Sequence, residues 1–208
     1  MSIILEPKTI ISPFKVIENG ILIIDEAGRI EYCGNREQAP KVKGKRLNLK
    51  GKTISPGFID IHVHGGFGIT FGIGDLAYEL EKYSQWAISG GVTGFLLSIS
   101  APDADSTCQL IQKYVKILEE GTSGATALGL HLEGPFLNPE KKGAFNPQWL
   151  HAPDPGEAKK YLELGKGWIK QITLAPELPN SREVAAMMHQ AQQRKSLSRL
   201  PNINQQVI

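Results

Sequence analysis

Two histidines spaced two residues apart are the first sign of chemistry in this sequence. His62 and His64 stand in the run PGFIDIHVHGG, which covers 56–66. Residues i and i+2 of a strand share a face, so both imidazoles are expected side by side at the carboxyl end of a strand over 57–64. Such a pair can bind one first-row metal, and it equally fits two ordinary polar residues at a strand end. Asp60 is expected on the same face, where it either orients an imidazole or caps a loop.

A carboxylate ends a second expected strand. Glu133 closes the run ATALGLHLE and is followed at once by Gly134 and Pro135, so the strand must stop there. A carboxylate that meets two imidazoles gives the mixed nitrogen and oxygen ligand set of hydrolytic metal sites. His131 shares the face of Glu133 one step deeper, and we expect it in an inner layer behind the metal rather than as a ligand.

Strands and helices that alternate along the chain must position these residues. Apolar runs predict strands over 57–64, 92–99, 125–132 and 168–174, and helical periodicity predicts helices over 75–89, 103–120, 157–164 and 180–194. Strands that alternate with helices argue for parallel βα units with right-handed crossovers. The predicted class is therefore α/β, with about four βα units of a TIM-type (β/α)8 barrel. A complete barrel takes about 250 residues, so these 208 residues are expected to hold only part of one.

The flanking segments differ from this pattern. Short apolar runs between Gly, Asp and Asn turns over 1–55 predict a small antiparallel β domain, and its basic stretch 41–52 is read as a solvated hairpin. The tail 195–208 shows neither helical nor strand periodicity. The expected organisation is a small β portion over 1–55, barrel units over 56–194 and an aperiodic tail over 195–208.

Composition excludes several classes of partner. Lys and Arg number 23 against 21 Asp and Glu, which gives a net charge of +2 and no bulk attraction to nucleic acid or membrane. No export signal or long apolar run is present, and the two cysteines, Cys33 and Cys108, lack metal-binding spacing. We therefore expect a cytoplasmic protein with no nucleic-acid or membrane partner.

Four stretches together resemble one enzyme family. SPGFIDIHVHGG, SGGVTGFLLSI, GLHLEGPFLNPEKKGA and ITLAPE are similar to successive strands of N-acetylglucosamine-6-phosphate deacetylases, within the amidohydrolase superfamily. The first motif marks only the superfamily, whereas HLEGPF followed by KKGA is more specific. The resemblance covers about 10–194 and implies a (β/α)8 barrel with a β-sandwich built from both chain ends.

The resemblance also implies an activity and roles for particular residues. It implies hydrolysis of the acetamide of N-acetylglucosamine 6-phosphate with one or two divalent metals such as zinc, iron or manganese, in a protein that can be a homo-oligomer. Glu133 matches a metal-binding carboxylate, and His62 and His64 match a pair that holds a second metal. Ala144 matches a position whose backbone lies against the substrate. Phe145 departs from the family, which has a sugar-contacting histidine there, so sugar specificity stays open.

Part of the family's machinery has no counterpart in the sequence. The family takes two further histidine ligands from strands five and six and an acid/base aspartate from strand eight, and nothing after Leu174 matches them. His151 lies in a Pro-rich loop and His189 within a helical pattern. The leading interpretation is thus the N-terminal half of such a deacetylase, inactive alone and with no catalytic acid/base of its own. The alternatives are another amidohydrolase, acting on a cyclic amide or a different acylated sugar, and a truncated product without turnover.

Overall fold

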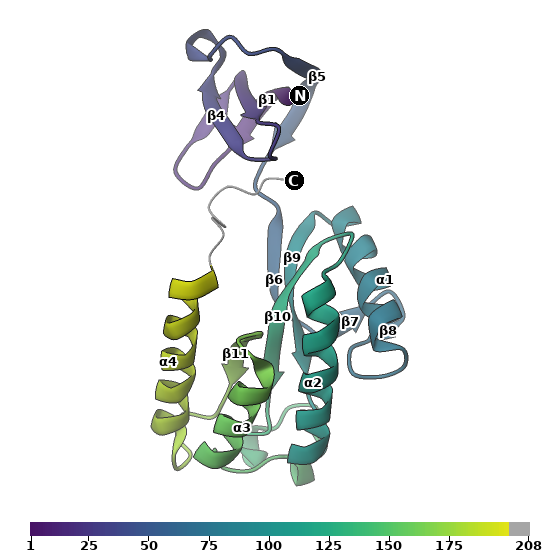
Figure 1. Ribbon diagram of the computed structural model, residues 1–208, viewed down its shortest axis with the longest axis vertical. Coiled ribbons are helices and arrows are strands. Elements are labelled where there is room, and N and C mark those ends of the chain that lie inside the picture. Colours follow the sequence, from purple (N-terminus) through teal and green to yellow (C-terminus); the bar gives the residue numbers. More distant parts are fainter. Residues whose placement is uncertain (200–208) are drawn as a thin grey trace. The chain divides into compact units, whose positions relative to one another are not determined.

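The computed structural model describes residues 1–199, and their side chains through residue 191. These residues form two compact units, 1–57 and 58–199 (Figure 1). Each unit has its own hydrophobic core.

The first unit is a five-stranded sheet. Its strands are β1 (Ser2–Ile11), β2 (Val16–Glu18), β3 (Gly20–Ile24), β4 (Ile30–Asn35) and β5 (Gly44–Ile54), with a short 3-10 helix at Arg36–Gln38. Strands β2, β1, β3 and β4 pair antiparallel in that order, and β5 pairs with β1 in parallel. Both faces of β3 are covered, because Ile21 and Ile23 pack into one apolar cluster and Leu22 and Ile24 into another. The sheet thus has a thin core on each side.

The basic stretch of this unit is not the expected hairpin. Residues 44–54 form one continuous strand whose register along β1 pairs Ile4 with Arg46 and Ile10 with Ile54. The prediction was wrong because this strand pairs in parallel with β1 at the start of the chain and not with a neighbouring stretch of its own. The sheet is consequently mixed rather than purely antiparallel.

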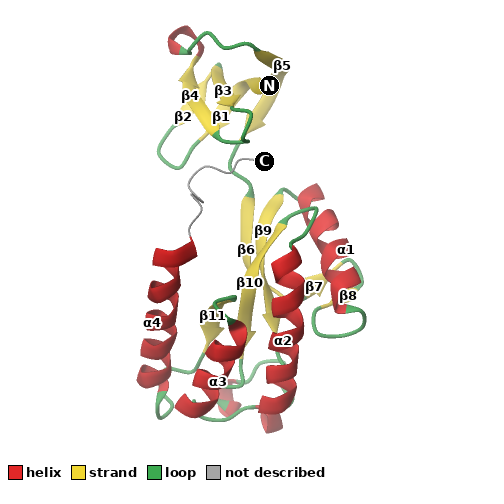
Figure 2. Ribbon diagram, in the orientation of Figure 1, coloured by secondary structure: helices red, strands yellow, loops and turns green. Residues whose placement is uncertain are grey.

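The second unit confirms the predicted succession of βα units. It runs β6 (Phe58–Val63), α1 (Leu76–Ser89), β9 (Val92–Ile99), α2 (Ala104–Glu120), β10 (Thr126–Glu133), α3 (Pro155–Gly165), β11 (Ile169–Thr173) and α4 (Ser181–Arg199). The four strands pair in parallel in the order β11-β10-β9-β6, and each helix packs against the next (Figure 2). This curled sheet is half of the eight strands that a TIM-type barrel requires. A short hairpin of β7 (Gly65–Gly66) and β8 (Ile69–Thr70) follows β6.

Helix starts in this unit are fixed by carboxylates. The side chains of Asp75, Asp103 and Asp154 accept hydrogen bonds from the backbone N–H groups of Tyr78, Ser106 and Glu157, respectively. Each bond satisfies one of the donors that a helix leaves unpaired at its first turn. Apolar stripes then pack the helices on the sheet, with Leu80, Ile111, Tyr114, Leu130 and Tyr161 among the fully buried side chains.

Within the described residues, β6 and β11 are the outer strands of the parallel sheet, each with one unpaired edge. Large apolar side chains of β6 are exposed, including Phe58 at 67%, Ile59 at 62% and Ile61 at 55%. Helix α4 continues to Arg199, so the first part of the expected aperiodic tail is helical, and residues 200–208 lie outside the described part. In residues 1–199 no helix is both long and apolar enough to cross a bilayer.

Candidate metal site

The two histidines of β6 and its following loop meet the carboxylate that ends β10. The Nε2 atoms of His62 and His64 lie 3.1 and 2.5 Å from the same oxygen, Oε2 of Glu133. One ligand atom from each of the three side chains lies within 4.8 Å of the others. Residues that are separated by about seventy positions in sequence therefore converge at one end of the parallel sheet, as the sequence predicts.

The charge of Glu133 is stabilised within this cluster. Its side chain is only 18% exposed. Burial raises the pKa of this carboxyl. The hydrogen bonds from His64 and His62 lower the pKa by more than burial raises it, so the pKa of Glu133 lies below its ordinary value. Glu133 is thus an anion that offers its oxygen to two imidazoles.

The donor set fits a divalent metal. Metal–nitrogen and metal–oxygen bonds of about 2.0–2.2 Å place two ligand atoms of a tetrahedral ion about 3.4 Å apart. The ligand atoms of this cluster are already within 4.8 Å of one another, so small side-chain rotations suffice. Within residues 1–191, whose side chains are described, no other group of three or more His, Cys, Asp or Glu side chains meets this geometry. The side chains of His62 and His64 are 48% and 44% exposed, which leaves the cluster open on one side.

Of the two roles expected for Asp60, the structure shows a hydrogen bond to the backbone and not one to an imidazole. A bulge shifts the register of β6 against β9 between Asp60 and Val63, so the simple alternation of faces fails there. The side chain of Asp60 lines a cavity with Tyr83 and Trp86 of α1, and its Oδ1 accepts a hydrogen bond from the backbone N–H of His62. Asp60 therefore fixes the backbone before the histidine pair and orients no imidazole.

His131 lies directly behind the cluster. It is fully buried, and its ring meets the ring of His62 edge-on at a centroid distance of 4.8 Å. Nδ1 is 2.8 Å from Oγ of Ser98 and Nε2 is 2.8 Å from Oγ1 of Thr173. Burial, with a contribution from the charge of His62, lowers the pKa of His131 to about 4, so this imidazole is neutral near pH 7. With both nitrogens engaged, His131 has no lone pair to offer a metal.

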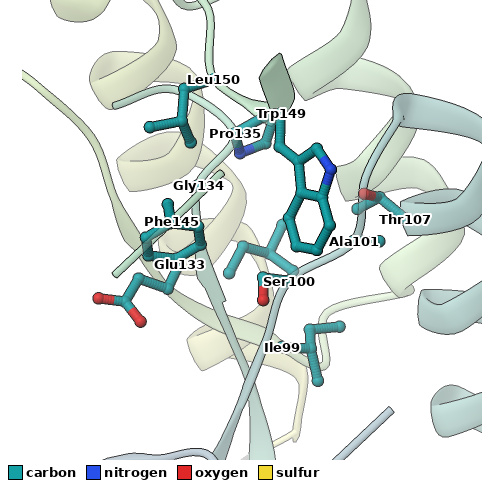
Figure 3. A pocket seen from close by; sticks show the side chains of 11 residues that line it. Ile99, Ser100, Ala101, Thr107, Glu133, Gly134, Pro135, Phe145, Trp149 and Leu150 are labelled. Atoms are coloured by element: carbon teal, nitrogen blue, oxygen red, sulfur yellow. The ribbon is translucent and has the colours of Figure 1, made fainter. Parts of the chain in front are cut away.

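The segment after Glu133 forms a compact loop beside the cluster. It contains 3-10 helices at Pro139–Lys141 and Pro147–Trp149. Phe145 and Trp149 line a small cavity together with Glu133 and Thr107, whereas Ala144 is exposed (Figure 3). The cavity measures about 10 Å³, which is room for about one water molecule and too little for a sugar. In Figure 3 the carboxylate of Glu133 points away from Trp149, so this cavity lies behind the candidate site.

Sequence reasoning missed three of these residues. Ser98 and Thr173 lie within the stretches SGGVTGFLLSI and ITLAPE, but neither is a residue type that signals a metal ligand, and only the pairing of β9, β10 and β11 brings them to His131. Trp149 could have been suspected as a large aromatic residue shortly after the KKGA motif. The other histidines lie outside the cluster: His151 contacts Glu157, with 3.5 Å between Nε2 and Oε2, and His189 is exposed on α4. Cys33 and Cys108 are free cysteines.

Residues 53–197 match the amidohydrolase family, and the chain belongs to that family. Two of its relatives carry the name of the same enzyme. The chain is 33% identical over 153 residues to N-acetylglucosamine-6-phosphate deacetylase of Danio rerio and 30% identical over 181 residues to that of Bacillus subtilis. These alignments cover 72% and 85% of this chain.

The fold shows the same likeness. A structure of N-acetyl-D-glucosamine-6-phosphate deacetylase from Mycobacterium smegmatis, a mutant in complex with N-acetyl-D-glucosamine-6-phosphate, superposes on 92% of this chain with a TM-score of 0.79 at 27% identity. The resemblance seen in the sequence motifs is therefore confirmed. The chain spans less than half of these relatives, namely 37% of the Danio protein, 45% of the Bacillus protein and 48% of the Mycobacterium chain.

Proposed function

We propose that this chain carries the metal-binding half of a deacetylase that hydrolyses the acetamide of N-acetylglucosamine 6-phosphate to glucosamine 6-phosphate and acetate. The observation that carries the proposal is the convergence of His62, His64 and Glu133, with both imidazoles on one carboxylate oxygen. Support also comes from relatives that carry this enzyme's name. The implied partner is a small phosphorylated amino sugar, and the implied place of action is the cytoplasm.

Each residue of the cluster has a distinct task in this proposal. His62 and His64 would hold a divalent metal through Nε2, and Glu133 would bind it through Oε2 and offset its charge. A bound divalent metal supplies a Lewis acid for the amide carbonyl and lowers the pKa of a water molecule. Binding requires the imidazoles to be neutral and free of the carboxylate, so the hydrogen bonds to Glu133 must give way. Those bonds keep the three side chains gathered until then.

The leaving amine requires a proton, and the three residues assigned to the metal, His62, His64 and Glu133, leave no residue assigned to donate it. A positioned acid/base is typically worth about 10²- to 10⁴-fold in rate. Residues 175–208 contain no aspartate and a single histidine, His189. We therefore expect the 208-residue chain to turn over slowly by itself, and to need a segment that supplies the acid/base and further ligands.

Phe145 favours a second class of substrate, one that is less polar than the sugar phosphate. Phe145 stands beside Glu133 where the resemblance implies a sugar-contacting histidine. A phenyl ring can pack on an apolar face of a ligand but cannot donate a hydrogen bond to a hydroxyl. A less polar acylated sugar or a cyclic amide is therefore the alternative substrate.

The deciding experiment measures acetate release by the purified 208-residue chain with Zn²⁺, Mn²⁺ or Fe²⁺ and N-acetylglucosamine 6-phosphate. It is repeated with a second polypeptide that carries the C-terminal half of the Bacillus subtilis relative. We expect little turnover alone and metal-dependent turnover in the mixture, lost in Glu133→Ala. Turnover near 1 s⁻¹ or faster by the chain alone, an ordinary enzymatic rate of about 1–10³ s⁻¹, would overturn the need for a second segment.

Two further arms separate the substrates. A hydantoin as a cyclic amide replaces the sugar in one, and Phe145→His is assayed on the sugar phosphate in the other. Hydrolysis of the hydantoin but not of the sugar would refute the deacetylase proposal in favour of the alternative. A gain of sugar deacetylation in Phe145→His would locate the substrate beside this loop.

A further inference from the structure

One buried histidine is unused by the metal chemistry proposed above. His131 has no exposed surface and lies two residues before Glu133 on β10. A buried polar side chain must have its hydrogen bonds satisfied, and an apolar residue would fill this place at lower cost if packing were its only purpose. The position of its ring indicates another purpose.

His131 is held from both sides by hydroxyl groups of the neighbouring strands. Oγ of Ser98 on β9 lies 2.8 Å from Nδ1, and Oγ1 of Thr173 on β11 lies 2.8 Å from Nε2. A neutral imidazole donates from one nitrogen and accepts at the other, and a hydroxyl can do either. Both bonds can therefore form at once, and they fix the plane of the ring across three strands.

The fixed ring is the inner support of His62. The two rings meet edge-on, with 4.8 Å between centroids and an interplanar angle of 82°. On another side His62 faces the ring of His64 at 5.4 Å, and about half of its own side chain is exposed. Of these two rings, only that of His131 is held by strands on both sides, so it is the fixed surface on which the imidazole of His62 packs.

We propose that His131 is a positioning residue of the metal site: braced by Ser98 and Thr173, its ring sets the orientation of His62 and so directs Nε2 toward Glu133. The inference rests on the proposed function, because it assumes that His62 binds a metal. Residues that orient metal ligands typically contribute 10- to 100-fold to metal affinity. Removing the hydroxyl of either Ser98 or Thr173 leaves the other hydroxyl in place. We therefore expect the metal affinity to fall by about tenfold, the lower end of this range.

The test uses Co²⁺ alone as the probe, with the 208-residue chain. Thr173→Val removes one brace and keeps the size of the side chain, whereas Thr173→Ser keeps the hydroxyl. We expect Co²⁺ to bind about tenfold more weakly to Thr173→Val, with a changed visible absorption spectrum, and expect Thr173→Ser to restore both. Ser98→Ala tests the opposite side of the ring in the same way.

A matched control separates positioning from loss of stability. Tyr114→Phe also removes a hydrogen bond in this unit, which Tyr114 Oη accepts from the backbone N–H of Gly72 at 2.7 Å. Tyr114 belongs to the hydrophobic core cluster and not to the metal site. We expect it to lower the melting temperature and leave the Co²⁺ affinity and spectrum unchanged.

The outcomes distinguish this inference from the proposed function. Unaltered affinity and spectrum in both Thr173→Val and Ser98→Ala would overturn the positioning role and leave the metal site intact. Equal changes in Tyr114→Phe would also overturn it, because they would trace the effect to stability. Failure of the unaltered chain to bind Co²⁺ would refute the metal site itself, and the positioning role with it.

Discussion

Replacing Glu133 by glutamine removes one charge from the centre of the candidate site and changes little else. Glutamine keeps the size of the side chain and one acceptor oxygen, so an imidazole can still donate to it. The anionic ligand is lost, and with it the group that offsets the charge of a divalent metal. We therefore expect Glu133→Gln to fold and to bind metal far more weakly.

The size of this effect follows from binding linkage. A metal at 100 times its dissociation constant stabilises the folded chain by about 2.7 kcal/mol. One kcal/mol corresponds to roughly 2–4 °C in melting temperature for a domain of this size, so metal should raise it by about 5–10 °C. If loss of the carboxylate weakens binding by about 100-fold, the same metal concentration adds only about 0.4 kcal/mol, or about 1–2 °C.

Thermal unfolding followed by circular dichroism, with and without metal, measures both shifts. Glu163→Gln makes the same chemical change at an exposed position of α3 and should retain the full metal-induced shift. A metal-induced shift in Glu133→Gln equal to that of the unaltered chain would refute the assignment of this carboxylate as a ligand.

Three further outcomes follow from the fold. The exposed apolar side chains and unpaired edge of β6 should make the 208-residue chain self-associate at about 10–100 µM, and Ile59→Lys should reduce the mass measured by light scattering after gel filtration. Asp103→Ala should lower the free energy of unfolding by about 0.5–2 kcal/mol in urea titrations, because the N–H of Ser106 loses its cap at 2.7 Å. The pKa of His131 is lowered to about 4, so its contribution to stability is complete above about pH 6.5 and declines as the pH falls toward 4, by up to about 3 kcal/mol. His131→Phe should flatten that decline, and an unchanged pH profile in this variant would contradict the buried neutral imidazole.

The local elements of the second unit could be predicted because each signal lies within a short stretch of sequence. The buried run 92–99 is observed as β9 with the same limits, and α1 and α2 begin directly after the acidic residues that cap them. Glu133 could be placed at a strand end because Gly134 and Pro135 stop the strand. Parallel pairing then brings it to the same end of the sheet as the histidine pair.

Features that depend on distant partners could not be predicted. The residues of β5 are mostly polar, and only its pairing with β1 makes 44–54 a strand. Asp60 was placed on the wrong face because the bulge in β6 leaves no mark in the pattern of apolar residues. Ser98 and Thr173 became site residues only when three strands brought them to His131, and no spacing rule connects them.

The order of strands in the second unit bears on how the chain can acquire its structure during synthesis. Strand β9 pairs with β6, β10 with β9, and β11 with β10, so each of these three later strands joins the strand of the parallel sheet made just before it. A growing chain can therefore add β9, β10 and β11 in turn at a single advancing edge, each beside a strand that has already been made. The first unit is different, because β1 keeps one side free until β5 has emerged. The first unit is synthesised first, but its β1–β5 pairing joins strands that are further apart in sequence order than the neighbouring strands of the parallel sheet.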